Sequence, residues 1–140
     1  MFAELCLVST GTGRIGKCNM AKILIIDDSV ELNQLIQTRL EADRHRVVTA
    51  KDGKEGLEKV ESEKPDLIIL DVKMPEMDGF EVCRILKNDS RYNKIPIIFL
   101  SAMAQQDDFK TGKEVGADAY VVKPYEPTIL LAKIESLLKK

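Results

Sequence analysis

The chain has 140 residues, 44% hydrophobic and 31% charged, which indicates one globular domain with a core rather than a disordered chain. Its 21 Lys and Arg against 23 Asp and Glu give a net charge of −2, so we expect no direct DNA binding. No apolar run approaches the roughly 18 residues of a membrane span, and the start carries an acid, so we expect a cytoplasmic protein outside the membrane.

Strand and helix patterns then alternate along the chain. Residues 23–26 are apolar and predict a buried strand that ends at two acidic residues. Ser29 is a candidate N-cap for the next helix, whose apolar residues predict packing on one side: Leu32, Leu35, Ile36 and Leu40. A second strand is predicted at residues 47–49, followed by a short helix marked by Leu57 and Val60.

The middle of the chain repeats this pattern. Residues 66–70 predict a third strand, residues 80–86 a helix and residues 96–100 a fourth strand. The third strand is apolar on both faces, which half-exposed antiparallel strands rarely show. A parallel sheet is therefore indicated.

A weaker helix is predicted over about residues 106–115. Gly112 within it costs about 1 kcal/mol relative to alanine, so we expect this helix to be the least stable. Gly116, just after it, suits a left-handed C-cap. Residues 120–122 predict a fifth strand, and a last helix carries an apolar stripe: Leu130, Ile134, Leu137 and Leu138.

Five strand–helix units occupy residues 22–140. They predict an α/β fold, a doubly wound five-stranded parallel sheet of order 2-1-3-4-5 in a flavodoxin-like three-layer sandwich. We expect residues 20–140 to form this domain. Residues 1–19 are interpreted as an N-terminal extension that is flexible, a misplaced start or a remnant of cloning.

Polar side chains follow four of the five strands. Residues 27–28 are both Asp, and the third, fourth and fifth strands are followed by Asp71, Ser101 and Lys123. Any one of these is more often a turn or cap residue. Because the carboxyl ends of parallel strands share one edge of the sheet, we expect all of them to meet there.

Three carboxylates at one edge repel each other unless a cation offsets their charge. Oxygen ligands suit Mg²⁺, so we expect Asp28 and Asp71 to be direct ligands. Asp27 would bind directly or through water, and the Lys73 carbonyl would complete the set.

The same edge could support phosphoryl transfer. If Asp71 attacks a phosphoryl donor, charge develops on the phosphoryl oxygens, where Lys123 and Ser101 are placed to bind it. The product would be an aspartyl phosphate on Asp71.

From Met20 to Lys140 the chain resembles a response regulator receiver domain. The resemblance rests on five motifs: Leu24-Ile25-Ile26-Asp27-Asp28-Ser29, Leu70-Asp71-Val72-Lys73-Met74-Pro75-Glu76-Met77-Asp78-Gly79, Ser101-Ala102, Tyr120, and Lys123-Pro124. Each motif is weak alone, whereas together they are specific.

The resemblance implies that a sensor histidine kinase or a histidine phosphotransfer protein phosphorylates Asp71. Ser101 and Tyr120 would then switch the face made by the fourth helix, fifth strand and fifth helix, which would dock a downstream partner. It also implies a cis bond between Lys123 and Pro124, and a phosphate lifetime tuned by Lys73 and Met103.

The protein would then be a signalling phosphoacceptor that catalyses only its own phosphoryl transfer and autodephosphorylation. We expect a monomer or a phosphorylation-dependent dimer. A stand-alone regulator, a receiver cut from a larger protein and a degenerate receiver that acts only by docking all remain open.

Other functions fit the residues less well. Residues 11–17 match a phosphate-loop pattern, but no helix can form before the next strand. A flavin carrier would have to place its phosphate against the acidic loop at residues 27–28. A phosphatase of the haloacid dehalogenase type needs an acid where Lys73 stands.

The single histidine and the three cysteines receive structural interpretations. His45 lies between two arginines, which favours a solvated loop residue over a catalytic one. Cys6, Cys18 and Cys83 are an odd number without a Cys-x-x-Cys pair, which argues against disulfides and zinc. Cys83 is expected to be a small core residue.

Overall fold

The computed structural model describes residues 21–74, 76–103 and 105–138. The expectations for residues 1–19, including the phosphate-loop pattern, Cys6 and Cys18, lie outside the described residues.

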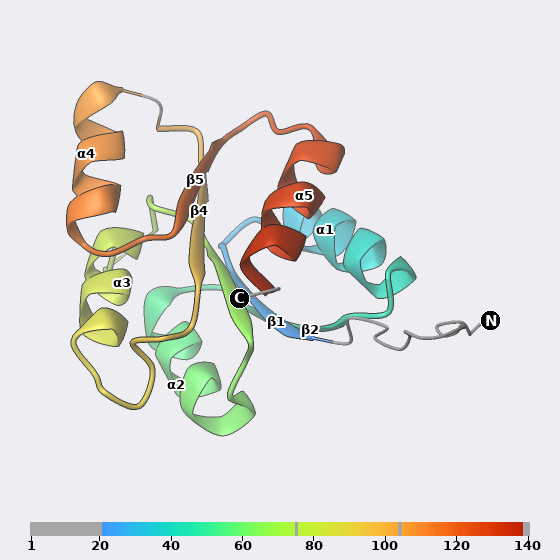
Figure 1. Ribbon diagram of the computed structural model, residues 1–140, viewed down its shortest axis with the longest axis horizontal. Coiled ribbons are helices and arrows are strands. Elements are labelled where there is room, and N and C mark those ends of the chain that lie inside the picture. The colour runs from blue at the N-terminus through green and yellow to red at the C-terminus, as the bar shows by residue number, and fades with distance from the viewer. Residues whose placement is uncertain (1–20, 75, 104, 139–140) are drawn as a thin grey trace.

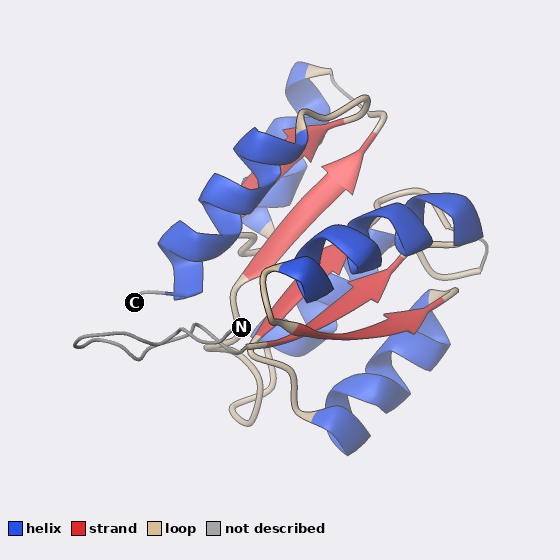
Figure 2. Ribbon diagram, turned by 90° about the vertical axis from the view of Figure 1, so that its right-hand side faces the viewer, coloured by secondary structure: helices blue, strands red, loops and turns tan. Residues whose placement is uncertain are grey.

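The strands form a single parallel sheet of order β2-β1-β3-β4-β5, as predicted. Figure 2 shows their arrows pointing the same way. The strands are β1 Lys22–Ile26, β2 Arg46–Ala50, β3 Leu67–Leu70, β4 Ile97–Ser101 and β5 Ala119–Val122. These bounds differ from the predicted ones by no more than one residue at any end, because backbone pairing with neighbours extends or shortens an apolar run.

Helices cover both faces of the sheet, which confirms the three-layer α/β fold. They are α1 Val30–Ala42, α2 Gly53–Glu63, α3 Gly79–Lys87, α4 Gln106–Glu114 and α5 Pro127–Leu138. Figure 1 shows α1 and α5 on one side of the strands and α2, α3 and α4 on the other.

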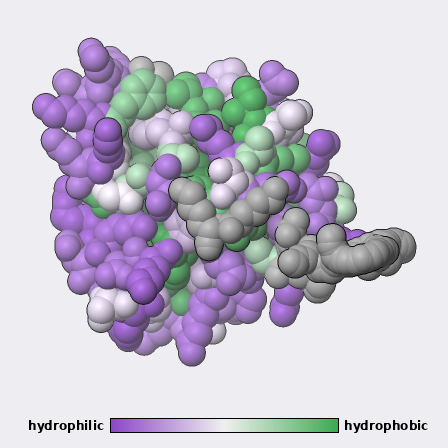
Figure 3. Space-filling view, in the orientation of Figure 1, coloured by the Kyte–Doolittle hydropathy of each residue, from purple (hydrophilic) through white to green (hydrophobic). Residues whose placement is uncertain are grey.

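The alternation of side chains along each strand divides the core in two. In β1, Ile23 and Ile25 pack with α1 and α5, whereas Leu24 and Ile26 pack in the cluster that α2, α3 and α4 cover. The side chains of β1, β3 and β4 in both clusters are almost completely buried, so the central strands are apolar on both faces. Hydrophilic residues cover the outer sides of α2, α3 and α4, at the left of Figure 3.

Short polar side chains cap the start of α1, α2 and α3, and a glycine follows the end of α4. Ser29 accepts a hydrogen bond from the Leu32 N–H at 3.3 Å, so it caps α1 as predicted. Gly116 has a φ of 97°, the left-handed conformation expected after α4. The expectation that α4 is the least stable helix stays a prediction.

Two expectations about burial are wrong. Leu35 was expected on the packed side of α1, but it is 66% exposed, because Ile36 and Leu40 occupy the side that faces the sheet. His45 was expected in solvent, but it is 4% exposed. Its Nδ1 accepts a buried hydrogen bond from the N–H of Ala21, the residue before β1, at 3.3 Å.

Cys83 is fully buried on α3, which confirms its interpretation as a core residue. Burial raises the pKa of its thiol to about 11. Among the described residues, no helix has the length and apolar character that crossing a membrane requires.

Candidate functional site

Four strands deliver polar side chains to one edge of the sheet. Asp27 follows β1, Asp71 follows β3, Ser101 ends β4 and Lys123 follows β5. Oxygen atoms of Asp27, Asp28 and Asp71 all lie within 4.8 Å of one another. The parallel sheet therefore gathers the residues that the sequence places far apart.

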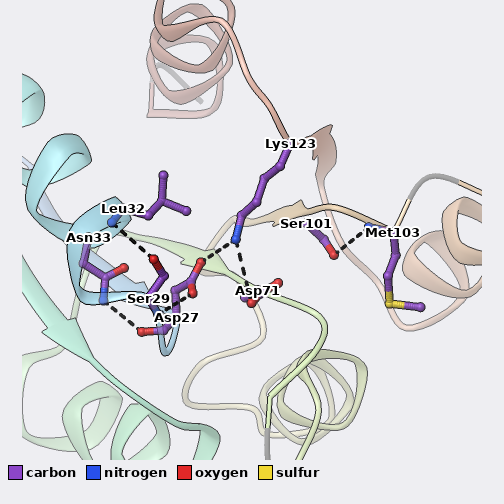
Figure 4. Close-up of polar contacts among 8 residues, drawn as sticks. All are labelled: Asp27, Ser29, Leu32, Asn33, Asp71, Ser101, Met103 and Lys123. Carbon is purple, nitrogen blue, oxygen red and sulfur yellow. Dashed lines mark hydrogen bonds and ion pairs between the residues drawn. The ribbon is translucent and has the colours of Figure 1, made fainter.

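Lys123 lies between two of these carboxylates (Figure 4). Its Nζ is 2.9 Å from Asp27 Oδ2 and 3.8 Å from Asp71 Oδ2. The closer of the two contacts is therefore with Asp27. The peptide bond from Lys123 to Pro124 is cis, as the family resemblance implied.

Asp71 is 7% exposed, and its pKa is raised from 3.8 to about 6. Burial is the main cause, followed by the charge of Asp27. Lys123 and the backbone N–H groups of Lys73 and Val72 act in the opposite direction. Asp71 is therefore largely ionised at neutral pH, and a cation near it would favour the ionised form.

Both carboxylate oxygens and the backbone carbonyl of Asp27 accept hydrogen bonds. Its Oδ1 accepts from the Ser29 N–H at 2.9 Å, and its Oδ2 from Lys123 Nζ. Its backbone carbonyl accepts from Asn33 Nδ2 at 2.8 Å. The short turn between β1 and α1 is thus fixed against the helix that follows it.

Gly79 packs directly against the backbone of Asp71. The Gly79 N–H donates to the Val72 carbonyl at 2.7 Å. A Cβ at position 79 would overlap the Asp71 carbonyl oxygen and lie 2.9 Å from Val72 Cα. The start of α3 therefore sets where the chain turns after β3.

Ser101 and Tyr120 meet at Met103. Ser101 Oγ accepts a hydrogen bond from the Met103 N–H at 3.1 Å, and the Tyr120 hydroxyl donates to the Met103 carbonyl at 2.6 Å. The Tyr120 ring packs against Phe99 and Phe109. A chain of contacts therefore links the site to α4.

The donor chemistry of the edge fits Mg²⁺. Asp27, Asp28 and Asp71 offer carboxylate oxygens, the ligand type that Mg²⁺ prefers, and no sulfur or imidazole belongs to the group. The predicted ligand role of the Lys73 carbonyl stays a prediction.

Two residues of this region carried too weak a signal to be assigned a role from the sequence. Asn33 is a lone polar residue among the apolar positions of α1, a pattern that also fits a solvated residue. Gly79 belongs to the matched motif, but its contact with the Asp71 backbone depends on how α3 meets the sheet.

Comparison with known proteins identifies relatives over most of the chain. Residues 23–135 match the response regulator receiver domain family. The chain is 46% identical over 122 residues to the probable transcriptional regulator ycf27 of Cyanophora paradoxa, covering 87% of this chain and 50% of that protein. It is 42% identical over 119 residues to the alkaline phosphatase synthesis transcriptional regulatory protein PhoP of Bacillus subtilis, covering 85% and 49%.

A solved structure has the same fold. The Vibrio cholerae chemotaxis protein CheY4 matches with a TM-score of 0.80 and 37% sequence identity, over 84% of this chain and 98% of that one.

These relatives correct one expectation. The net charge led us to expect no direct DNA binding, but ycf27 and PhoP are named as transcriptional regulators, so that expectation is wrong. The chain spans about half the length of both proteins. The net charge of this receiver domain carries no information about the rest of such a regulator, so it could not exclude DNA binding.

Proposed function

The chain belongs to the response regulator receiver domain family, and from that membership we propose that Asp71 accepts a phosphoryl group in a two-component phosphorelay. The donor would be a phosphohistidine on a sensor kinase or on a histidine phosphotransfer protein. Such a protein acts as a signalling phosphoacceptor.

One observation carries this proposal. Asp71 is nearly buried at the carboxyl end of β3, with carboxylate oxygens of Asp27 and Asp28 within 4.8 Å and Lys123 Nζ at 3.8 Å. The Lys123 ammonium is shared with Asp27, so the two neighbouring acids leave Asp71 in an environment with excess negative charge. The arrangement suits a nucleophile that gains its partners when a phosphoryl group and a cation arrive.

The transfer step requires the ionised form of Asp71. An Oδ of Asp71 attacks the phosphorus, a P–O bond forms, and the P–N bond to the donor histidine breaks with its electron pair moving to the imidazole nitrogen. As the phosphoryl group is transferred to Asp71, the Lys123 ammonium shifts from Asp27 toward the negatively charged phosphoryl oxygens. The Ser101 hydroxyl donates to another of these oxygens.

Asp27, Asp28 and Asp71 would hold Mg²⁺, with the Lys73 carbonyl as a further ligand. When bound, Mg²⁺ supplies positive charge that balances the phosphoryl oxygens. Autodephosphorylation would then be attack of water on the same phosphorus. Lys73 would contact the phosphoryl group and Met103 would restrict water, so both would tune the lifetime of the phosphate.

The switch would use the contacts at Met103. When Ser101 turns toward the phosphoryl group, its hydrogen bond from the Met103 N–H is lost. The Met103 carbonyl is the acceptor for Tyr120, so a shift of this loop moves the aromatic ring against α4. Phosphorylation would thereby select between two packings of Tyr120.

We propose transcription as the output, since ycf27 and PhoP are regulators of transcription. Residues 20–140 would be the receiver unit, acting in the cytoplasm.

Incubation with Mg²⁺ and acetyl phosphate tests the proposal. Mass spectrometry should show one phosphoryl adduct on the wild type and none on Asp71→Asn. Glu76→Gln, an exposed acid in the same loop, is the matched control and should be phosphorylated normally. An adduct that survives in Asp71→Asn, or none in the wild type, would refute the proposal.

A further inference from the structure

Helix α1 has one polar side chain on its buried side. Asn33 is 7% exposed and shares that side with Ile36 and Leu40, which pack on the sheet. Burying a side-chain amide costs free energy unless both its nitrogen and its oxygen find partners.

Only the amide nitrogen of Asn33 is paired. Nδ2 donates to the Asp27 carbonyl at 2.8 Å in a buried contact, and Figure 4 shows the side chain reaching from α1 to the turn that holds Asp27 and Ser29. Oδ1 is buried and has no hydrogen-bond partner among the described residues. The side chain thus bears the cost of a half-paired amide at a position where a leucine would be stabilised by burial.

The hydrogen bond from Asn33 to the Asp27 carbonyl therefore adds little net stability. Its main effect is to fix the conformation of the turn between β1 and α1. Asp27 is also fixed by Ser29 and Lys123, so its carboxylate has other supports. Asp28 is exposed, and its direction depends on the backbone of the turn. The hydrogen bond from Asn33 holds that backbone one residue before Asp28.

We propose that Asn33 is a positioning residue for the divalent cation: it clamps the β1–α1 turn to α1 so that Asp27 and Asp28 face Asp71. The inference rests on the proposed function, because it takes Mg²⁺ as the cation. Asn33 itself is not a ligand. Its loss should weaken Mg²⁺ binding without weakening the fold.

The test compares Asn33→Leu with Gln34→Leu, a carboxamide that is exposed on the same helix. MgCl₂ is titrated into each protein while backbone amide NMR signals of the turn are followed, and thermal unfolding is measured in EDTA. We expect the Kd for Mg²⁺ to rise about tenfold in Asn33→Leu, as for other residues that orient metal ligands. Its thermal midpoint in EDTA should equal or exceed that of the wild type, and Gln34→Leu should match the wild type in Kd.

Phosphorylation by acetyl phosphate provides a second readout. Asn33→Leu should need about ten times more Mg²⁺ for half its maximal rate, yet reach the wild-type rate at saturation. Asn33→Ala, which adds no bulk to the core, repeats both measurements if the leucine variant does not fold.

A Kd within about twofold of the wild type in a folded Asn33 variant would overturn the inference. Failure of the proposed function looks different: the wild type itself would show no Mg²⁺-dependent shift, or Asp28→Asn would bind Mg²⁺ as tightly as the wild type. Either result would remove the metal site and the role of Asn33 with it.

Discussion

Lys123 is paired more closely with Asp27 than with Asp71, at 2.9 Å against 3.8 Å. Asp27 is almost completely buried, so the ammonium offsets a charge that would otherwise lie uncompensated in the protein. The negative charge of Asp71 is thus less well compensated than that of Asp27. This suits a carboxylate that must accept a phosphoryl group.

Lys123→Gln should lower the free energy of unfolding by up to about 3 kcal/mol, because it leaves the buried Asp27 carboxylate without its cation. It should also slow phosphorylation of Asp71. Urea unfolding and the rate of adduct formation measure the two effects. Lys133→Gln, an exposed lysine on α5, should change neither. Equal stability of Lys123→Gln and the wild type would contradict the role of this ion pair.

Asp71→Asn should stabilise the Mg²⁺-free protein at neutral pH. The folded-state pKa of Asp71 is about 6 and its ordinary value is 3.8, so the folded state binds more protons between these values. Stability from this group is therefore present at low pH and lost as pH rises through 6. Asp71→Asn should gain up to about 3 kcal/mol near pH 8 and almost nothing near pH 4. A gain that does not vary with pH in EDTA would contradict this account.

Acid should destabilise the protein through His45. Burial lowers the pKa of His45 below its ordinary value of 6.5, although Asp43 and Glu135 act in the opposite direction. The unfolded state therefore binds more protons below pH 6.5, and stability falls as pH falls through that window. His45→Asn, whose Oδ1 can accept the Ala21 N–H, should lose less stability than the wild type on acidification. Parallel slopes of unfolding free energy against pH would disprove the prediction.

Gly79→Ala should disturb the phosphoacceptor through its backbone. The added Cβ would overlap the Asp71 carbonyl oxygen, so the start of α3 must move. We expect a loss of about 1–3 kcal/mol and slower phosphorylation, measured by thermal unfolding and adduct formation. Glu81→Ala, exposed on the same helix, is the control. Wild-type rate and stability in Gly79→Ala would show that the turn after β3 adapts freely.

Tyr120→Phe removes the hydrogen bond to the Met103 carbonyl but keeps the ring. Stability should fall by about 1 kcal/mol, and phosphorylation of Asp71 should be unchanged. In the wild type, phosphorylation should shift the ring NMR signals of Tyr120.

Ser101→Ala tests whether that shift depends on the hydroxyl. The Tyr120 ring shift on phosphorylation should be smaller in Ser101→Ala than in the wild type, because the variant has no hydroxyl that can leave the Met103 N–H for the phosphoryl group. A full response of Tyr120 in Ser101→Ala would exclude the hydroxyl from the switch.

Most of the fold could be predicted from the sequence, because it depends on patterns within single elements. The apolar runs of β1 and β3 and the caps at Ser29 and Gly116 act over a few residues. The parallel order followed from strand–helix alternation. Leu35 was misplaced because helical spacing does not show which part of a broad apolar stripe meets the sheet.

The sequence by itself determined the kinds of groups at the site: carboxylates, a hydroxyl and a lysine, each at the end of an apolar run. Only the tertiary structure decided their pairing, because contacts across the sheet edge depend on how each turn is held. Lys123 contacts Asp27 first, Asn33 contacts the Asp27 carbonyl, and Gly79 contacts the backbone of Asp71. Burial likewise depends on all neighbouring elements at once, so the environment of His45 could not be predicted from the charges beside it in the chain.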